Sequence, residues 1–374
     1  MPIATQAGPP IRGEVVYLFA FDVAYEMMRQ PIPELLGYRV EQYSVDVSKR
    51  IPRQISFYRP QIIRLPPLKW RLPAGEVEIK RSVKLLAIGA VSISLHVPFE
   101  VGRIGDLVPY HDLAFAQGTL HQEVRKLAEQ VRTELGKYCV RPLQKLEDEE
   151  AYTVFCLEAP VLGTDGKSQR TEDWLREHRR EVAALLTQEP VSQHLSDQEA
   201  GESTDKYLSY YEQDLQVVDW DAALVIDHPK DFDEALYIFE LANLQLVELA
   251  AYDRILDAAL DRAYRDLGQK SSRRRLKVQR ELRELRIDMA RFSDELLNTT
   301  KFFGDWHLAR VYQTISARFH LTDWHRIVEE KLKTLDELYE LLQHEQNNRW
   351  MLIMEVTVIL LFVLEIFLAF GGHK

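Results

Sequence analysis

Residues 350–370 read WMLIMEVTVILLFVLEIFLAF, and their only charged side chains are Glu355 and Glu365. As an α-helix rising about 1.5 Å per residue, the stretch would extend roughly 30 Å, which matches the hydrocarbon core of a bilayer. Trp350 and Phe370 stand at its two ends, where aromatic side chains suit the membrane interfaces. The stretch therefore predicts one C-terminal transmembrane helix rather than a buried core helix.

The two glutamates in this stretch need an explanation, because a charged group in hydrocarbon costs about 2.5–3.5 kcal/mol or more. Ten residues separate Glu355 from Glu365, which places them about 80° apart around a helix. One helix cannot shelter both carboxyl groups from lipid. We therefore expect self-association or a partner helix, with Trp350, Glu355 and Glu365 on the membrane and oligomer face. An acidic pore or proton site, or snorkelling without function, are the alternatives.

The rest of the chain indicates where the protein resides. Residues 15–21 are apolar but too short for a signal peptide, and Asp22 ends them. The two cysteines, Cys139 and Cys156, suit a reducing compartment and rule out a disulfide scaffold. We expect a single-pass membrane protein, with membrane lipid as a partner and the N-terminal part in the cytosol. The net charge of −11 argues against a general nucleic-acid binder.

The predicted fold class is α+β, with a mixed α/β domain over residues 1–228. Periodicity predicts strands at 15–21 and 152–157 and a hairpin of 77–86 with 91–97 around Gly89. Helices are predicted at 112–138 and 173–186, and the polar residues 193–206 are predicted to be a loop. A second hairpin, formed by 207–211 and 216–226, is predicted to close the domain.

Residues 229–349 are predicted to form a stalk of long antiparallel helices, a coiled-coil hairpin that leads into the transmembrane helix at 350–370. Pro229 followed by Asp231 is typical of a helix start. Apolar residues at helical spacing mark arms over 231–268, from 276 onward, and over 327–342. These arms could pack within one chain or across a homo-oligomer.

A basic tip is predicted between the first two arms, where it could contact anionic lipid or RNA. Interleaved Glu281 and Glu284 also fit an ordinary solvated helix face. The basic tip consists of Lys270, Arg273, Arg274, Arg275, Lys277, Arg280 and Arg283.

The sequence contains only weak matches to motifs for phosphate binding, metal binding or catalysis. Residues 163–168 resemble a phosphate loop, but Val161 stands where that motif requires glycine. A set of five aspartates could hold a divalent cation, although helix capping and solvation explain it more simply. No nucleophile stands beside a base, so we predict no enzyme and no catalytic, cofactor or metal residues. The five aspartates are Asp219, Asp221, Asp227, Asp231 and Asp233.

The C-terminal third resembles the family of proteins required for meiotic nuclear division, a membrane-anchored domain of unknown function. Residues 297–304, LNTTKFFG, are similar to that family's L-D-T-P-D-F-F-W element, and residues 326–332, RIVEEKL, to a following helix. The matching element positions are Asn298, Thr299, Phe302 and Phe303, and two family glutamates ten residues apart match Glu355 and Glu365. The resemblance covers about residues 235–370 and implies a divergent bacterial member without enzymatic activity, located in the bacterial inner (cytoplasmic) membrane.

Taken together, these patterns predict a non-enzymatic, C-terminally anchored protein that self-associates as a scaffold or tether. An ion-conducting homo-oligomer with an acidic transmembrane helix, similar to magnesium channels, is an alternative; the chain lacks the Gly-Met-Asn signature of those channels. An enzyme within residues 1–228 is a second alternative. No cofactor or small-molecule substrate is identified from the sequence.

Overall fold

The computed structural model describes residues 10–28, 30–43, 61–72, 75–86, 88–115, 118–147, 149–163, 166–267, 286–287 and 306–371. Contacts divide the chain into two compact units. The first comprises Met1–Ala250 and Asp294–Thr322, and the second comprises Ala251–Ser293 and Asp323–Lys374. A large N-terminal sheet and C-terminal helices confirm the predicted α+β class.

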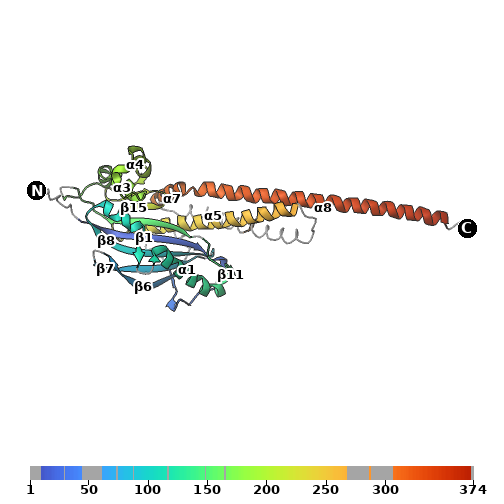
Figure 1. Cartoon of the computed structure of the whole chain (residues 1–374), viewed down its shortest axis with the longest axis horizontal. Helices are drawn as coiled ribbons and strands as arrows, with labels where there is room; N and C mark the ends of the chain where they lie inside the picture. Colours follow the sequence, from blue (N-terminus) through green and yellow to red (C-terminus); the bar gives the residue numbers. More distant parts are fainter. Residues whose placement is uncertain are drawn as a thin grey trace. The chain divides into compact units, whose positions relative to one another are not determined.

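A nine-stranded mixed sheet organises the first unit, in the order β13-β14-β15-β12-β1-β8-β7-β6-β5 (Figure 1). β12 and β15 run parallel, whereas the other neighbouring strands of this sheet are antiparallel. Its strands are β1 (Ile11–Asp22), β5 (Glu41–Gln42), β6 (Gln61–Leu72), β7 (Gly75–Leu85), β8 (Ala90–Val101), β12 (Glu150–Glu158), β13 (Tyr207–Leu208), β14 (Leu215–Val218) and β15 (Ala222–Asp227). Shorter strands outside this sheet are β2 (Ala24–Met27), β3 (Glu34–Leu35), β4 (Tyr38–Arg39), β9 (Ala114–Phe115), β10 (Gly118–Thr119) and β11 (Cys139–Pro142).

The β7–β8 hairpin confirms the prediction made from alternating residues around Gly89. Gly89 has a φ of +93°, which a residue with a Cβ atom rarely adopts. A Cβ built there would lie 1.9 Å from the Ala24 carbonyl oxygen. The turn therefore requires glycine both for its backbone conformation and for the close approach of the neighbouring chain.

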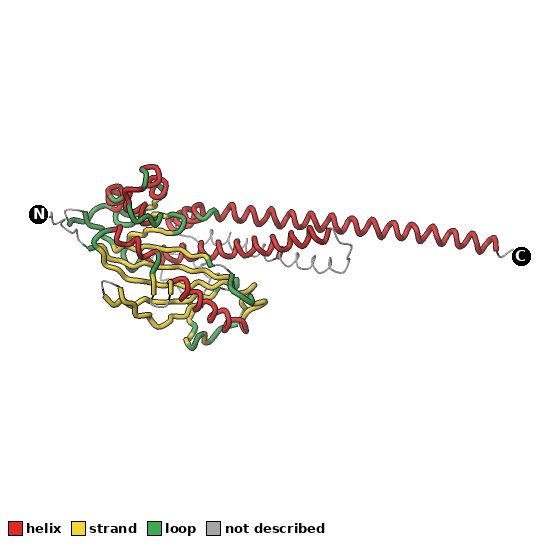
Figure 2. Tube along the Cα trace, viewed as in Figure 1, coloured by secondary structure: helices red, strands yellow, loops and turns green. Residues whose placement is uncertain are grey.

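One face of the sheet carries the main hydrophobic core. Because side chains alternate along a strand, the odd-numbered residues of β1 and β8, such as Phe19 and Ile93, point to the same face. The amphipathic helix α1 packs its Val124 and Val131 into this core. Figure 2 shows the helices of this unit on both sides of the sheet. The elements that contribute to this core include η1 (Ile104–His111), α1 (Leu120–Leu135), α2 (Thr171–Glu177) and α3 (Arg179–Leu186).

The opposite face of the sheet is covered by α5 (Phe232–Leu267) and α7 (Trp306–Arg318). Leu244 and Val247 of α5 pack against Ala20 and Ala90 on this face. Tyr152 of β12 stacks on Phe239 of α5 with ring centroids 5.6 Å apart, and it meets Phe319 edge-on at 4.9 Å. This cover is centred on β12 and β1.

The prediction of a loop at residues 193–206 is wrong. The segment contains η3 (Ser192–His194) and α4 (Asp197–Thr204). The Glu199 backbone N–H donates to the Ser196 side-chain oxygen at 3.1 Å, which caps the first turn of α4. Ala200 and Thr204 are buried, so tertiary packing stabilises a helix whose polar composition resembles that of a loop.

The second unit contains the C-terminal part of α5 and most of α8 (Leu321–Gly371). Lys331 of α8 lies 2.6 Å from a carboxylate oxygen of Asp253 and 2.7 Å from one of Asp257, both on α5. Leu256 and Val328 are among the buried residues of this unit. The predicted arms at 231–268 and 327–342 are therefore helical. Of the arm predicted from 276 onward, the structure describes only residues 286–287, which are helical.

Within the part of the chain that the structure describes, no helix combines the length and apolarity needed to cross a bilayer. The predicted transmembrane helix is therefore not supported. Residues 350–370 do form part of the helix α8, and the side chains of 367–370 lie outside the described residues. The three-part organisation into residues 1–228, 229–349 and 350–370 stays a prediction.

Candidate functional site

Residues 350–366 of α8, here called the apolar segment, are exposed at every position. Fourteen large apolar side chains in it are 45–64% exposed, between Val363 and Met354 at the two extremes. Trp350, Glu355 and Glu365, the predicted membrane and oligomer face, all lie on this exposed helix. A helix that is apolar all round normally lies in a core or in lipid. The described residues supply no such cover.

The other residues predicted from the sequence lie outside the described residues. They are Arg273, Arg274, Arg275 and Lys277 of the basic tip and Asn298, Thr299, Phe302 and Phe303 of the family-like element. Contact of the basic tip with lipid or RNA stays a prediction.

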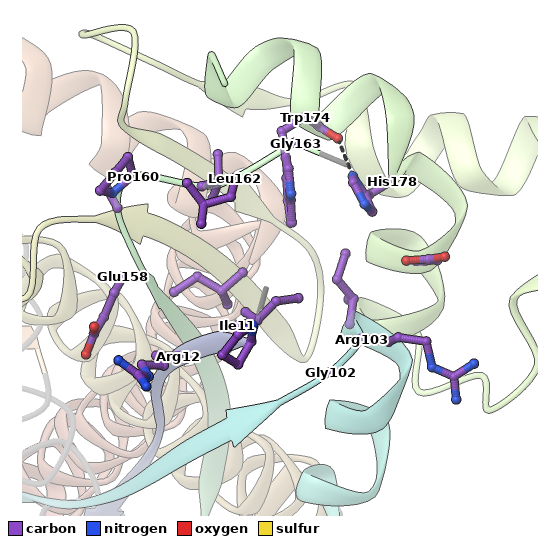
Figure 3. Close-up of a pocket in the computed structure, with 16 residues that line it drawn as sticks. Ile11, Arg12, Gly102, Arg103, Glu158, Pro160, Leu162, Gly163, Trp174 and His178 are labelled. Carbon is purple, nitrogen blue, oxygen red and sulfur yellow. Dashed lines mark hydrogen bonds between the residues drawn. The ribbon is translucent and has the colours of Figure 1, made fainter. Parts of the chain in front are cut away.

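A cavity of about 580 Å³, here called the edge pocket, opens where β12 ends (Figure 3). This volume is typical of sites for small molecules. Its lining comes from the start of β1, the junction of β8 with η1, the loop after β12 and the helices α2 and α3. The carboxyl end of a parallel pair, here β12 with β15, is a frequent place for ligands in α/β sheets.

Two polar side chains of the edge pocket have defined partners: a backbone carbonyl for His178 and the Glu100 carboxylate, at 3.1 Å, for Arg12. His178 donates from Nδ1 to the Trp174 carbonyl oxygen at 2.9 Å, because a carbonyl can only accept. Its ring stacks on Trp174 with centroids 4.6 Å apart. Nε2 of neutral His178 is therefore an acceptor. Arg12 and Glu158 lie side by side on the opposite side of the pocket (Figure 3). This arrangement suits a ligand with an apolar body and a polar end.

Asp227, the last residue of β15, lies beside the loop that lines the edge pocket. Its backbone oxygen accepts from the Ala159 N–H at 2.8 Å, and its carboxylate accepts from the His228 N–H at 2.7 Å. Burial, and then the nearby charges of Asp214 and Asp231, raise the pKa of Asp227 to about 6. The protonated form is therefore favoured in the folded protein relative to the unfolded chain.

Replacing Asp227 with asparagine is expected to increase stability above pH 7. A raised carboxyl pKa means that the stability provided by the protonated form is present near pH 4 and is lost as pH rises through about 6. Asparagine keeps the acceptor without the charge, so we expect a gain of about 1 kcal/mol at pH 8 after allowance for solvent screening. Thermal unfolding of Asp227→Asn and wild type at pH 8 and pH 4.5 measures this.

The matched control for this experiment is Asp221→Asn, which removes an exposed carboxylate at the other end of β15. It should not reproduce the gain of Asp227→Asn, because the Asp221 side chain is exposed to solvent. An equal gain for Asp227→Asn at both pH values would show that the carboxylate carries no such penalty.

The five aspartates noted in the sequence do not form one site. Asp219 faces Arg318, with 2.7 Å between the carboxylate and guanidinium atoms. Among the described residues, no group of three or more His, Cys, Asp or Glu side chains could hold a metal ion. The edge pocket itself was not predicted, because it joins residues of β1, η1, α2 and the loop after β12. The start of β1, Ile11-Arg12-Gly13, and the Ala159-Pro160-Val161 loop match no motif for ligand binding.

The fold and its pocket define an α+β protein with a nine-stranded mixed sheet and a ligand-sized cavity at the carboxyl end of its parallel pair. The chain belongs to the family described as "Uncharacterized protein MJ0711, N-terminal domain", whose model matches residues 12–233. A relative from Methanocaldococcus jannaschii, described as "Uncharacterized protein MJ0711", is 24% identical over 221 residues. The match covers 59% of this chain and 66% of that relative. No solved structure matches the chain.

These comparisons refine the family expected from the sequence. A domain of unknown function is confirmed, but it lies in the N-terminal part, at residues 12–233. The resemblance of residues 235–370 to the meiotic nuclear division family gains no support from them.

Proposed function

We propose that the chain is a non-enzymatic scaffold that attaches to a lipid bilayer through the apolar segment and self-associates there. The observation that carries this proposal is the exposure of all seventeen residues of 350–366. Soluble monomers rarely expose a contiguous apolar patch larger than a few hundred Å². Covering fourteen half-exposed apolar side chains is worth on the order of 10 kcal/mol, which is a strong drive toward lipid.

The two glutamates explain why attachment would be coupled to self-association. Glu355 and Glu365 lie on the exposed helix, and their carboxyl groups have an unfavourable position in lipid. Packing the apolar segments of two or more copies would give these groups polar neighbours and remove them from hydrocarbon. The resemblance of residues 326–332 and of the two glutamates to a membrane-anchored family supports the same role.

Flotation with liposomes tests attachment. The full chain should float with phosphatidylcholine vesicles and resist an alkaline carbonate wash. The variant Leu360→Arg/Leu361→Arg places two charges in the middle of the apolar segment and should stay in the soluble fraction. Ile255→Arg is the matched control, because Ile255 is a similarly exposed apolar residue on α5, at 42%. It should float like the wild type. A full-length chain that remains soluble in the presence of vesicles contradicts the proposal.

Self-association is measured separately, as the mass of the full chain in detergent by light scattering. We expect an oligomer, and we expect Glu355→Lys to change its mass, because a lysine ammonium would sit where copies meet. If the chain is a monomer in detergent but still floats with liposomes, attachment to the bilayer is supported and self-association is excluded.

A further inference from the structure

The face of the sheet that α5 and α7 cover at β12 and β1 is polar farther along, over β8, β7 and β6. A second cavity, of about 680 Å³, lies on this part of the face and is here called the trench. Its floor carries Ser94 and His96 of β8, Lys80 and Ser82 of β7, and Arg64 of β6. A sheet face packed on a core would carry apolar side chains at these positions.

Strand register brings these polar side chains together. Arg64 is paired with Ser82, Ser82 with Ser94, and Lys80 with His96 across neighbouring strands. Directly paired residues have Cβ atoms about 5 Å apart, so the five side chains form two adjacent rows on one face. The trench therefore presents a compact polar floor built from three strands.

Hydrogen bonds order the side chains of the trench floor and still leave a serine hydroxyl and a histidine nitrogen available to a ligand. The Ser82 and Ser94 hydroxyl oxygens are 2.7 Å apart, so one hydroxyl donates to the other and the second keeps its proton for another acceptor. His96 Nδ1 lies 3.1 Å from a carboxylate oxygen of Glu14 on β1. Because a carboxylate accepts, Nδ1 donates and Nε2 stays available to a second partner.

Charge is separated across the trench. The acids Glu14, Glu158 and Asp233 line the side formed by β1, β12 and α5, whereas bases line the side formed by β6 and β7, namely Arg64, Lys80 and Arg81. Of these, Arg64 is paired with Glu41 at 2.5 Å. Glu78 on β7 is the exception. At the inner end, Lys84 and Glu240 neutralise each other as a buried pair. Lys80 and Asp233 are both exposed, and neither has an ion-pair partner in the described part of the chain.

We propose that the trench binds a small zwitterion, a molecule with an ammonium group at one end and a carboxylate or phosphate at the other. The anionic end would meet Lys80 and the serine pair, and the ammonium end would meet Glu14 and Asp233. A purely anionic ligand is disfavoured by the acids of β1 and α5, and a purely cationic one by the bases of β6 and β7. This inference stands apart from lipid attachment, because every group in it belongs to the first unit.

Calorimetric titration of the full chain in detergent tests the proposal with defined probes. The zwitterions are O-phosphoethanolamine and glycylglycine. The two probes that carry charge of one sign only, each corresponding to half of O-phosphoethanolamine, are inorganic phosphate and ethanolamine. We expect at least one zwitterion to bind at least 10-fold more tightly than either half. Lys80→Gln and Asp233→Asn should each weaken that binding about 10-fold or more, as expected for losing a hydrogen bond to a charged group.

The control is Lys69→Gln, which removes an exposed lysine from β6 that does not line the trench. It should leave the affinity unchanged. Because Lys80 and Asp233 are exposed, their variants should fold, and unchanged thermal unfolding verifies this. The proposal is overturned if neither zwitterion binds at 10 mM, if phosphate or ethanolamine binds as tightly as the zwitterion, or if Lys69→Gln weakens binding as much as Lys80→Gln. Tighter binding of O-phosphoethanolamine than of glycylglycine would favour a phosphate-containing ligand, and the reverse a peptide or amino acid.

Discussion

Replacing Glu240 with alanine is expected to lower the free energy of unfolding by about 3–5 kcal/mol. Glu240 of α5 forms an ion pair with Lys84 of β7, and the two side chains are only 4% and 11% exposed. The Ser92 hydroxyl donates to the other carboxylate oxygen at 2.6 Å, and the Lys84 ammonium lies 4.2 Å from the centre of the Tyr43 ring. Alanine would leave the Lys84 charge buried without its partner.

The titration of Lys84 supports this expectation. Burial by itself lowers the pKa of Lys84, but the Glu240 carboxylate and Tyr43 together raise it by more, so the net pKa lies above the ordinary value. Once Glu240 is removed, only Tyr43 still opposes the effect of burial, and the balance shifts toward a neutral amine. The loss of stability in Glu240→Ala should therefore become smaller as pH rises from 7 to 10.

Urea unfolding of the full chain in detergent, followed by tryptophan fluorescence, measures the effect. The double variant Lys84→Met/Glu240→Leu should recover most of the loss, because apolar residues of similar volume can replace a buried ion pair. Glu100→Ala is the matched control, since it breaks the Arg12–Glu100 pair, whose side chains are 60% and 56% exposed. That change should leave the free energy of unfolding almost unchanged, because solvent screens an exposed pair. A similarly small cost for Glu240→Ala would show that the buried pair contributes little.

Replacing Asp219 with alanine is expected to cost a similar amount, about 3–5 kcal/mol, and to loosen α7. The Asp219 and Arg318 side chains are 6% and 11% exposed, and they join the turn before β15 to the end of α7. Arg318 also donates to the Glu202 carbonyl oxygen at 3.0 Å. Without the carboxylate, the buried guanidinium would keep this backbone carbonyl as its one acceptor among the described residues.

Hydrogen–deuterium exchange distinguishes a local effect from global unfolding here. Asp219→Ala should increase exchange over Trp306–Arg318 more than over β1 and β8, because the ion pair holds one helix against the sheet. Asp221→Ala removes an exposed acid two residues away and serves as the control. Uniform loss of protection across the sheet in Asp219→Ala would mean that α7 does not open as a separate unit.

Local patterns predicted much of this fold. Alternation on both sides of Gly89 predicted the β7–β8 hairpin, and Pro229 with Asp231 predicted the start of α5, because both signals lie within a few residues. α4 was missed because burial of Ala200 and Thr204, not propensity, stabilises it. The trench could not be predicted either. It depends on the pairing of Arg64, Ser82 and Ser94, and register between strands is a tertiary property.

The edges of the large sheet bear on how copies of this protein can meet. β13, at one edge, has only two residues, and β6, near the other edge, contains Pro66 and Pro67 at a break in its register with β7. Proline offers no N–H, and an irregular strand is a poor template for another chain. These two strands therefore disfavour the pairing of sheet edges between neighbouring copies of the protein. Self-association of the kind proposed above would therefore use surfaces other than these two strands.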